Sequence, residues 1–143
     1  MAVLARALAG AALALAAGTA LAAAKGAAAR GDPQTGQEIY ARCIACHALA
    51  YDRTGPRHCG LIGRRAGSMK DFPYSAAMRR SKIVWGEKTL DRFLANPLKA
   101  VPGTSMGYAG ITDSKERADL IAYLGRVNTS SECRKLPRPP RAD

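Results

Sequence analysis

Apolar residues recur at helical spacing in only a few parts of this chain. Asp32 and Pro33 form a typical helix start, in which a capping carboxylate precedes a first-turn proline. Four residues then recur at three- and four-residue spacing on one face: Gly36, Ile39, Tyr40 and Cys43. The pattern predicts a helix from about residue 32 to about Cys46, because residues three and four apart share a helix face.

A second periodic segment lies closer to the C-terminal end. Asp113 or Ser114 can cap this segment, and Glu116 lies in its first turn. Its apolar face consists of Leu120, Tyr123, Leu124 and Val127. The pattern predicts a helix that packs this face against the rest of the domain.

The remaining segments have mostly the composition of loops. One short helix is predicted over residues 89–95 and ends at the Asn-Pro pair 96–97. Residues 48–82 and 100–110 are rich in glycine and proline, and the chain shows neither an internal repeat nor a convincing alternating strand pattern. We therefore expect an all-α domain with long loops. Because a small number of helices buries little apolar surface, we expect a non-protein group to fill the core.

The two ends of the chain differ from the middle. Residues 1–24 have one basic residue, a long Ala/Leu run and small residues at its end, which predicts a signal peptide cleaved near residues 22–24. An uncleaved membrane anchor is the alternative, since the run just reaches the length of a membrane helix. Residues 25–30 are expected to be a linker, 31–128 the domain, and 129–143 a basic, Pro-rich tail.

Composition and charge narrow the function classes. The 143 residues include 48% hydrophobic and 23% charged residues, which suits one small globular domain. There are 22 Lys and Arg against 11 Asp and Glu, so the partner is expected to be anionic. The chain has no helix-turn-helix and no basic-aromatic platform, and export separates it from chromosomes, so nucleic acid is not the expected partner.

The run Cys43-Ile44-Ala45-Cys46-His47 carries the most specific chemistry. Two thiols one helical turn apart can add to the two vinyl groups of a haem, and the adjacent histidine can then reach the iron. A plain disulfide or redox pair would leave His47 unexplained. Zinc bound with the help of Cys59 and Cys133 is a further alternative, but the spacing does not resemble a compact zinc module.

A methionine is the expected ligand on the other side of the iron. Met106 follows Pro102 and Gly103 in a loop, where a thioether has no obvious core-packing role. His58 is the rival ligand, although it lies on a loop that would have to wrap around the ring edge. Met78 is expected to fill a gap in the core.

These motifs together resemble those of class I cytochromes c of the short-chain mitochondrial and bacterial kind. The resemblance covers residues 31–127, and its motifs occur in family order: Cys43 to His47, Thr54-Gly55-Pro56, Gly60 to Arg64, Trp85-Gly86-Glu87, Asn96-Pro97, Pro102 to Met106 and Glu116 to Leu124. It implies an all-α fold in which the N- and C-terminal helices cross and long loops surround one haem c, attached covalently through Cys43 and Cys46 and ligated by His47 and Met106.

The resemblance also implies roles for the residues around the haem. Pro56 would support His47 through its carbonyl. Arg64, Tyr74 and Trp85 would surround the propionates, and Thr104 would lie on the methionine side. Four positions differ from the usual family residues: His58 for Leu, Met78 for Asn, Phe93 for Tyr and Tyr108 for Phe. We expect these differences to affect the reduction potential and the strength of the methionine bond.

The function implied is that of a soluble, monomeric one-electron carrier in the periplasm and not of an enzyme. Its donor and acceptor would be acidic redox proteins: a membrane complex or a dehydrogenase upstream, and a terminal oxidase, reductase or reaction centre downstream. The basic tail could also touch an anionic membrane weakly. The alternatives are a haem subunit held in an enzyme complex, and a peroxidase-like or sensor protein whose Met106 bond opens.

Two further cysteines lie outside the haem motif. In an oxidising compartment Cys59 and Cys133 are expected to form a disulfide, which would tie the loop after Pro56 to the segment beyond the last helix. Two free thiols are the alternative.

Overall fold

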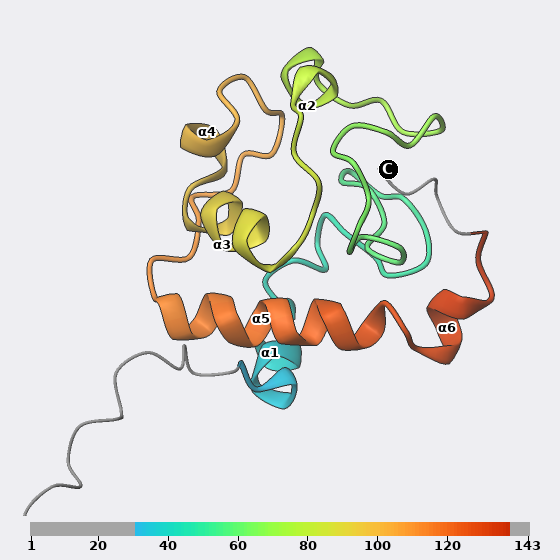
Figure 1. Ribbon diagram of the computed structural model, residues 1–143, viewed down its shortest axis with the longest axis vertical. Coiled ribbons are helices and arrows are strands. Elements are labelled where there is room, and N and C mark those ends of the chain that lie inside the picture. Colours follow the sequence, from blue (N-terminus) through green and yellow to red (C-terminus); the bar gives the residue numbers. More distant parts are fainter. Residues whose placement is uncertain (1–30, 138–143) are drawn as a thin grey trace, which may run out of the picture.

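A computed structural model describes residues 31–137, which form an all-α domain (Figure 1). Its helices are α1 (Pro33–Tyr40), α2 (Ala76–Arg80), α3 (Glu87–Ala95), α4 (Pro97–Ala100), α5 (Ser114–Val127) and α6 (Ser131–Arg134). Within this range the only extended pairing is an isolated bridge between Arg65 and Val84. The expected signal peptide (1–24), the linker (25–30) and the last six residues of the tail lie outside the described residues.

The first helix begins as the sequence predicts but ends earlier. The Asp32 carboxylate accepts a hydrogen bond from the Gln34 amide at 2.8 Å, and Pro33 occupies the first turn. The α-helix ends at Tyr40, and residues 41–46 continue as hydrogen-bonded turns. In these turns the Cys46 amide donates to the Cys43 carbonyl at 3.1 Å, so the two thiols still lie one tight turn apart.

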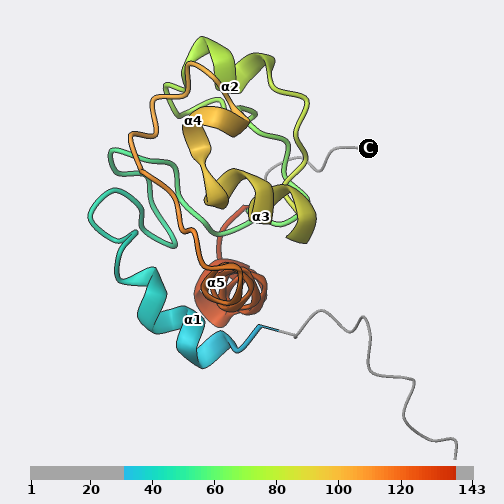
Figure 2. The same cartoon turned by 90° about the vertical axis from the view of Figure 1, so that its left-hand side faces the viewer.

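The crossing of α1 and α5 is the closest helix packing in the described part of the chain. Figure 2 shows α1 lying across α5, which is seen end on. Gly36 makes the approach possible, because a Cβ atom at this position would lie 2.0 Å from the Asp119 carbonyl oxygen and 2.8 Å from the Tyr123 Cβ. Asp119 is itself buried, and its carboxylate accepts from the Asp32 amide and the Lys115 ammonium.

Three short helices were not predicted from the sequence. Helices of four or five residues are too short to show a hydrophobic period, so only their caps could have indicated them. Ser75 caps α2, Ser130 caps α6, and Asn96 caps α4 by accepting from the Lys99 amide at 2.9 Å. The Asn96-Pro97 pair thus ends α3 and also starts α4, since proline is favoured at the first helical position.

The segment beyond α5 is anchored to the domain. It was predicted to be a tail from residue 129, yet it forms α6, in which Cys133 is 5% exposed. Cys133 and Cys59 are joined as a disulfide, and their Cα atoms lie 5.0 Å apart. The loop after Pro56 and the end of the domain are therefore adjacent. None of the helices among residues 31–137 is long and apolar enough to cross a membrane.

Candidate functional site

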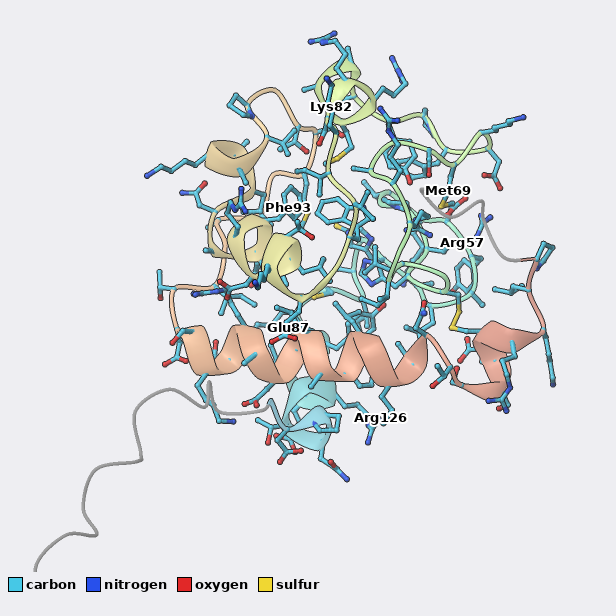
Figure 3. All side chains as sticks on the ribbon, in the orientation of Figure 1. Arg57, Met69, Lys82, Glu87, Phe93 and Arg126 are labelled. Atoms are coloured by element: carbon cyan, nitrogen blue, oxygen red, sulfur yellow. A yellow bond between two sulfur atoms is a disulfide. The ribbon has the colours of Figure 1, made fainter. Side chains whose placement is uncertain are left out.

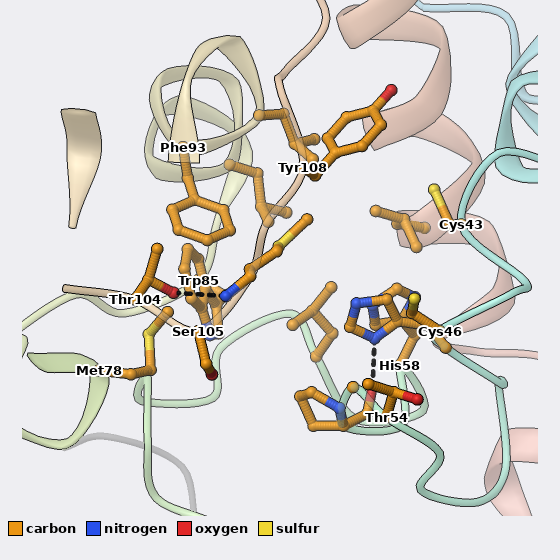
Figure 4. Close-up of a pocket in the computed structure, with 18 of the residues that line it drawn as sticks. Cys43, Cys46, Thr54, His58, Met78, Trp85, Phe93, Thr104, Ser105 and Tyr108 are labelled. Carbon is orange, nitrogen blue, oxygen red and sulfur yellow. Dashed lines mark hydrogen bonds between the residues drawn. The ribbon is translucent and has the colours of Figure 1, made fainter. Parts of the chain in front are cut away.

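A cavity of about 360 Å³ lies between the turns after α1 and the loop before α5 (Figure 4). This volume falls in the range of roughly 300–1,000 Å³ that is usual for ligand and cofactor sites. All the site residues predicted from the sequence line it: Cys43, Cys46, His47, Pro56, Arg64, Tyr74, Trp85, Phe93, Thr104, Met106 and Tyr108. The sequence reasoning missed most of the aliphatic wall, which includes Leu61, Leu90 and Leu94, because these residues look like ordinary core positions.

His47 is held in one orientation by the loop that follows it. Its Nδ1 atom lies 2.7 Å from the Pro56 carbonyl oxygen, which accepts a hydrogen bond when this nitrogen carries the proton. That tautomer leaves Nε2 free to coordinate a metal. Burial lowers the pKa of His47 below its usual value, and this favours the neutral imidazole that ligation requires.

Gly55 completes this side of the cavity. A Cβ atom at this position would lie 2.3 Å from Cε1 and 2.6 Å from Nε2 of His47, so any side chain there would displace the ring. The Gly55 amide also donates to the Cys46 carbonyl at 2.7 Å. The glycine of the Thr-Gly-Pro motif is therefore explained by the close approach of the backbone to His47.

The methionine loop forms the other side of the cavity. Thr104 and Ser105 lie across the cavity from Cys43 and Cys46 (Figure 4). The Met106 amide donates to the Thr104 hydroxyl at 3.3 Å, which orders the loop directly before the thioether. Gly103 has φ of 86°, a left-handed conformation that glycine adopts without strain.

Aromatic rings close the cavity behind this loop. The Trp85 and Phe93 rings meet edge to face, with their centroids 5.0 Å apart, and both side chains are buried. Phe93 carries no hydroxyl, so at this position it offers the Met106 sulfur no hydrogen bond. Met78 is 8% exposed and belongs to the apolar core, in agreement with the expected gap-filling role.

Arg64 supplies a buried positive charge at the cavity wall. Its side chain donates to the carbonyl oxygens of Cys59 and Arg57, at 3.2 Å and 3.0 Å. Its Nε is buried and has no hydrogen-bond partner among the described residues. A buried donor of this kind needs an acceptor, and a carboxylate group of a ligand in the cavity would supply one.

His58, the rival ligand from the sequence, lies on the same side of the cavity as His47. The two imidazole rings are stacked, with their centroids 4.3 Å apart and an angle of 21° between their planes. A second ligand must approach the metal from the opposite face. His58 therefore does not lie on the opposite wall of the cavity, which the loop of Met106 forms.

Several features together fit a haem with two carboxylates. The cavity has a Cys pair with an adjacent neutral histidine at one side, a methionine loop at the other, apolar walls and an unpaired buried arginine donor. The fold and the site define a small all-α domain built around one haem. Such a domain is typical of electron-transfer proteins.

The comparisons give the family. The cytochrome c family model matches residues 33–128, so this chain belongs to the cytochrome c family. It is 52% identical over 99 residues to a cytochrome c of Tetrahymena pyriformis, a match that covers 68% of this chain and 90% of that protein. It is 41% identical over 99 residues to a cytochrome c2 of Rhodomicrobium vannielii, a match that covers 67% of this chain and 79% of that protein.

A solved structure supports the same assignment. Cytochrome cH from Methylobacterium extorquens aligns with a TM-score of 0.65 and 38% sequence identity, covering 67% of this chain and 99% of that one. Membership of this family implies one covalently bound haem c per chain, and it makes the chain an electron-transfer protein and not an enzyme. The recognised family and the all-α fold expected from the sequence are thus confirmed.

Proposed function

We propose that the chain is a monohaem one-electron carrier in which Cys43 and Cys46 hold the haem and His47 and Met106 ligate its iron. The observation that carries this proposal is that the Cys-x-x-Cys-His turns and the Met106 loop form opposite walls of one apolar cavity. The bound haem supplies a metal centre that changes its charge by one electron.

The protein residues adjust this centre without taking part in bond chemistry. The Pro56 carbonyl holds His47 in the tautomer that ligates, and the apolar walls disfavour the additional positive charge of the oxidised site. Arg64 would compensate the charge of the propionates, with Tyr74 and Trp85 beside it. Together as ligands, the Met106 thioether and the His47 imidazole would favour the reduced iron, so the reduction potential is expected to be raised.

A redox titration of the purified protein, followed by optical spectroscopy, tests this function. The reduced protein should show the α band of a c-type haem, and the haem should stay bound after denaturation and solvent extraction. A spectrum without this band would overturn the haem assignment. A potential well below zero would leave the haem but overturn Met106 as a ligand.

The carrier is proposed to work in the periplasm as a free monomer. This rests on residues 1–24, which have the pattern of a cleaved signal peptide, and on the similarity to bacterial cytochromes c2 and cH. N-terminal sequencing of the mature protein should find a start at residues 23–25. A mature protein that still begins at Met1 would argue for an anchored form.

The partner proteins are proposed to be acidic. Among the basic residues near the cavity, Arg57 is engaged by Asp52 and Asp71 and is a poor candidate for docking. Lys82 is exposed and lies in the chain between two residues of the cavity wall, Met78 and Trp85. Together with Arg79, Arg80 and Lys99, which are also exposed, it is the proposed docking site.

Charge reversal at Lys82 should slow electron transfer with an acidic partner several-fold at low salt, and raising the ionic strength should remove the difference. Stopped-flow kinetics over a range of salt concentrations would measure this effect. Arg126→Glu is the matched control, because Arg126 lies at the opposite end of the molecule beside α1 (Figure 3). Equal slowing by both variants would contradict docking near Lys82.

The Cys59–Cys133 disulfide is proposed to persist in the exported protein. The two cysteines are 74 positions apart in the sequence. Closing a loop of this length stabilises the folded state by about 4 kcal/mol on the chain-entropy estimate. The double variant Cys59→Ser, Cys133→Ser should therefore unfold at markedly lower denaturant concentration while keeping its haem spectrum. Thiol titration of the denatured wild-type holoprotein should find no reactive group, and two reactive thiols per chain would contradict the disulfide.

A further inference from the structure

The His47 imidazole is restrained by three separate contacts. The Pro56 carbonyl fixes its Nδ1 at 2.7 Å, and the Gly55 backbone lies against its Cε1 edge. The third contact is the nearly parallel His58 ring, 4.3 Å away between centroids. The hydrogen bond and the backbone contact hold the edge of the ring, and the stacked ring lies against its face, so all three contacts limit rotation about the axis through Nε2.

His58 is itself fixed by the elements around it. Its Nδ1 lies 3.1 Å from the Tyr40 hydroxyl oxygen, and the two rings meet edge to face at 5.6 Å. The backbone is fixed as well, since the His58 amide donates to the Ala48 carbonyl at 3.0 Å and the next amide donates to Leu49 at 2.8 Å. The neighbouring residue, Cys59, carries the disulfide.

Tyr40 connects this pair of rings to the helix crossing. It is 5% exposed at the end of α1, and its ring packs against Tyr123 of α5 with centroids 5.1 Å apart. Burial raises the pKa of Tyr40, so its hydroxyl stays protonated and can donate to His58 Nδ1. A continuous row of rings thus runs from α5 through Tyr40 and His58 to His47.

The contact between His58 and His47 is a ring-stacking contact, because their planes lie 21° apart and their centroids 4.3 Å apart. A flat ring at this distance leaves the His47 imidazole little room to turn out of its plane. The contact is therefore a packing restraint on His47.

We propose that His58 is a positioning residue, whose stacked ring sets the rotation of the His47 imidazole plane relative to the haem, and that Tyr40 holds His58 in place for this purpose. The inference rests on the proposed function, in that His47 must be an iron ligand. The orientation of the imidazole plane decides how its π orbitals overlap with the iron d orbitals. His58 therefore sets the magnetic anisotropy of the oxidised iron and contributes to its potential.

The test compares His58→Leu and His58→Phe with the wild-type holoprotein. Leucine removes the stacked ring, whereas phenylalanine keeps a flat ring without its hydrogen bond. For the oxidised protein we expect His58→Leu to change the electron paramagnetic resonance g values and the spread of the haem methyl NMR shifts. His58→Phe should restore most of the wild-type pattern, and His58→Leu should also shift the midpoint potential.

Tyr40→Phe provides a second, milder test, because it keeps the packing and removes only the hydroxyl that holds His58. We expect its g values and haem methyl shifts to change in the same direction as those of His58→Leu, but by less. If His58→Leu does not load haem, Tyr40→Phe decides whether the His58 ring orients His47. Met69→Leu is the control and should leave the methyl shifts unchanged, because Met69 is buried but does not line the cavity. Wild-type g values and methyl shifts in the folded His58 and Tyr40 variants would overturn the proposal. The c-type α band of the wild type tests the proposed function separately.

Discussion

Replacing Met106 with leucine should abolish the weak near-infrared band of methionine-to-iron coordination and lower the midpoint potential strongly. The substitution removes the sulfur atom but nearly conserves volume, so the change in packing alone should cost less than about 1.5 kcal/mol. Without the thioether the site no longer favours the reduced iron. The fall should be on the order of a few tenths of a volt, within the roughly 0.8 V over which axial ligands set haem potentials. Spectroelectrochemistry measures both effects.

Met78→Leu is the matched control for this experiment. Met78 lines the same cavity and is buried, but it does not belong to the loop proposed to supply the ligand. The Met78→Leu variant should keep the near-infrared band, and its midpoint potential should stay close to that of the wild type. A loss of the band in Met78→Leu, with the band intact in Met106→Leu, would reverse the ligand assignment.

Replacing Gly36 with alanine should destabilise the whole domain. The added Cβ atom would lie 2.0 Å from the Asp119 carbonyl oxygen, so α1 and α5 would have to move apart along their crossing. Overpacking of a core costs roughly 1–3 kcal/mol, and a clash with backbone belongs at the upper end of this range or above it. With about 4–8 °C per kcal/mol for a domain of this size, the melting temperature should fall by roughly 12 °C or more.

Gly125→Ala is the control for the glycine substitution. Gly125 lies within α5, and a Cβ atom there would meet nothing within 4 Å. Alanine is favoured over glycine in a helix by about 1 kcal/mol, so this variant should be as stable as the wild type or more stable. Thermal unfolding followed by far-ultraviolet circular dichroism measures both variants. Equal melting temperatures for Gly36→Ala and Gly125→Ala would contradict the close crossing.

The success of the sequence predictions depended on the length of the element. The helix that follows the cap at Asp113 was predicted from this cap and from its apolar face, because its fourteen residues are enough to show a helical period. The helices α2, α4 and α6 span five residues or fewer and show no period. The first helix was predicted too long, since Cys43 continues its apolar spacing although the chain has already passed into turns.

The sequence by itself determined the chemistry of the site and the family. The Cys-x-x-Cys-His run and the loop methionine are short motifs whose meaning comes from local spacing, and such spacing survives in any fold that allows a tight turn. The sequence also indicated which residues would line the cavity proposed to hold the haem, because the family resemblance covers nearly the whole domain.

Only the tertiary structure decided how these residues support one another. The position of His58 beside His47, the unpaired donor of Arg64 and the contact of Gly36 with Asp119 all depend on segments brought together across the chain. Local periodicity carries no information on such contacts, because they are set by the packing of loops and helices around the shared cavity. The sequence could therefore present His58 as a rival ligand, and only the fold placed it against His47, the proposed ligand.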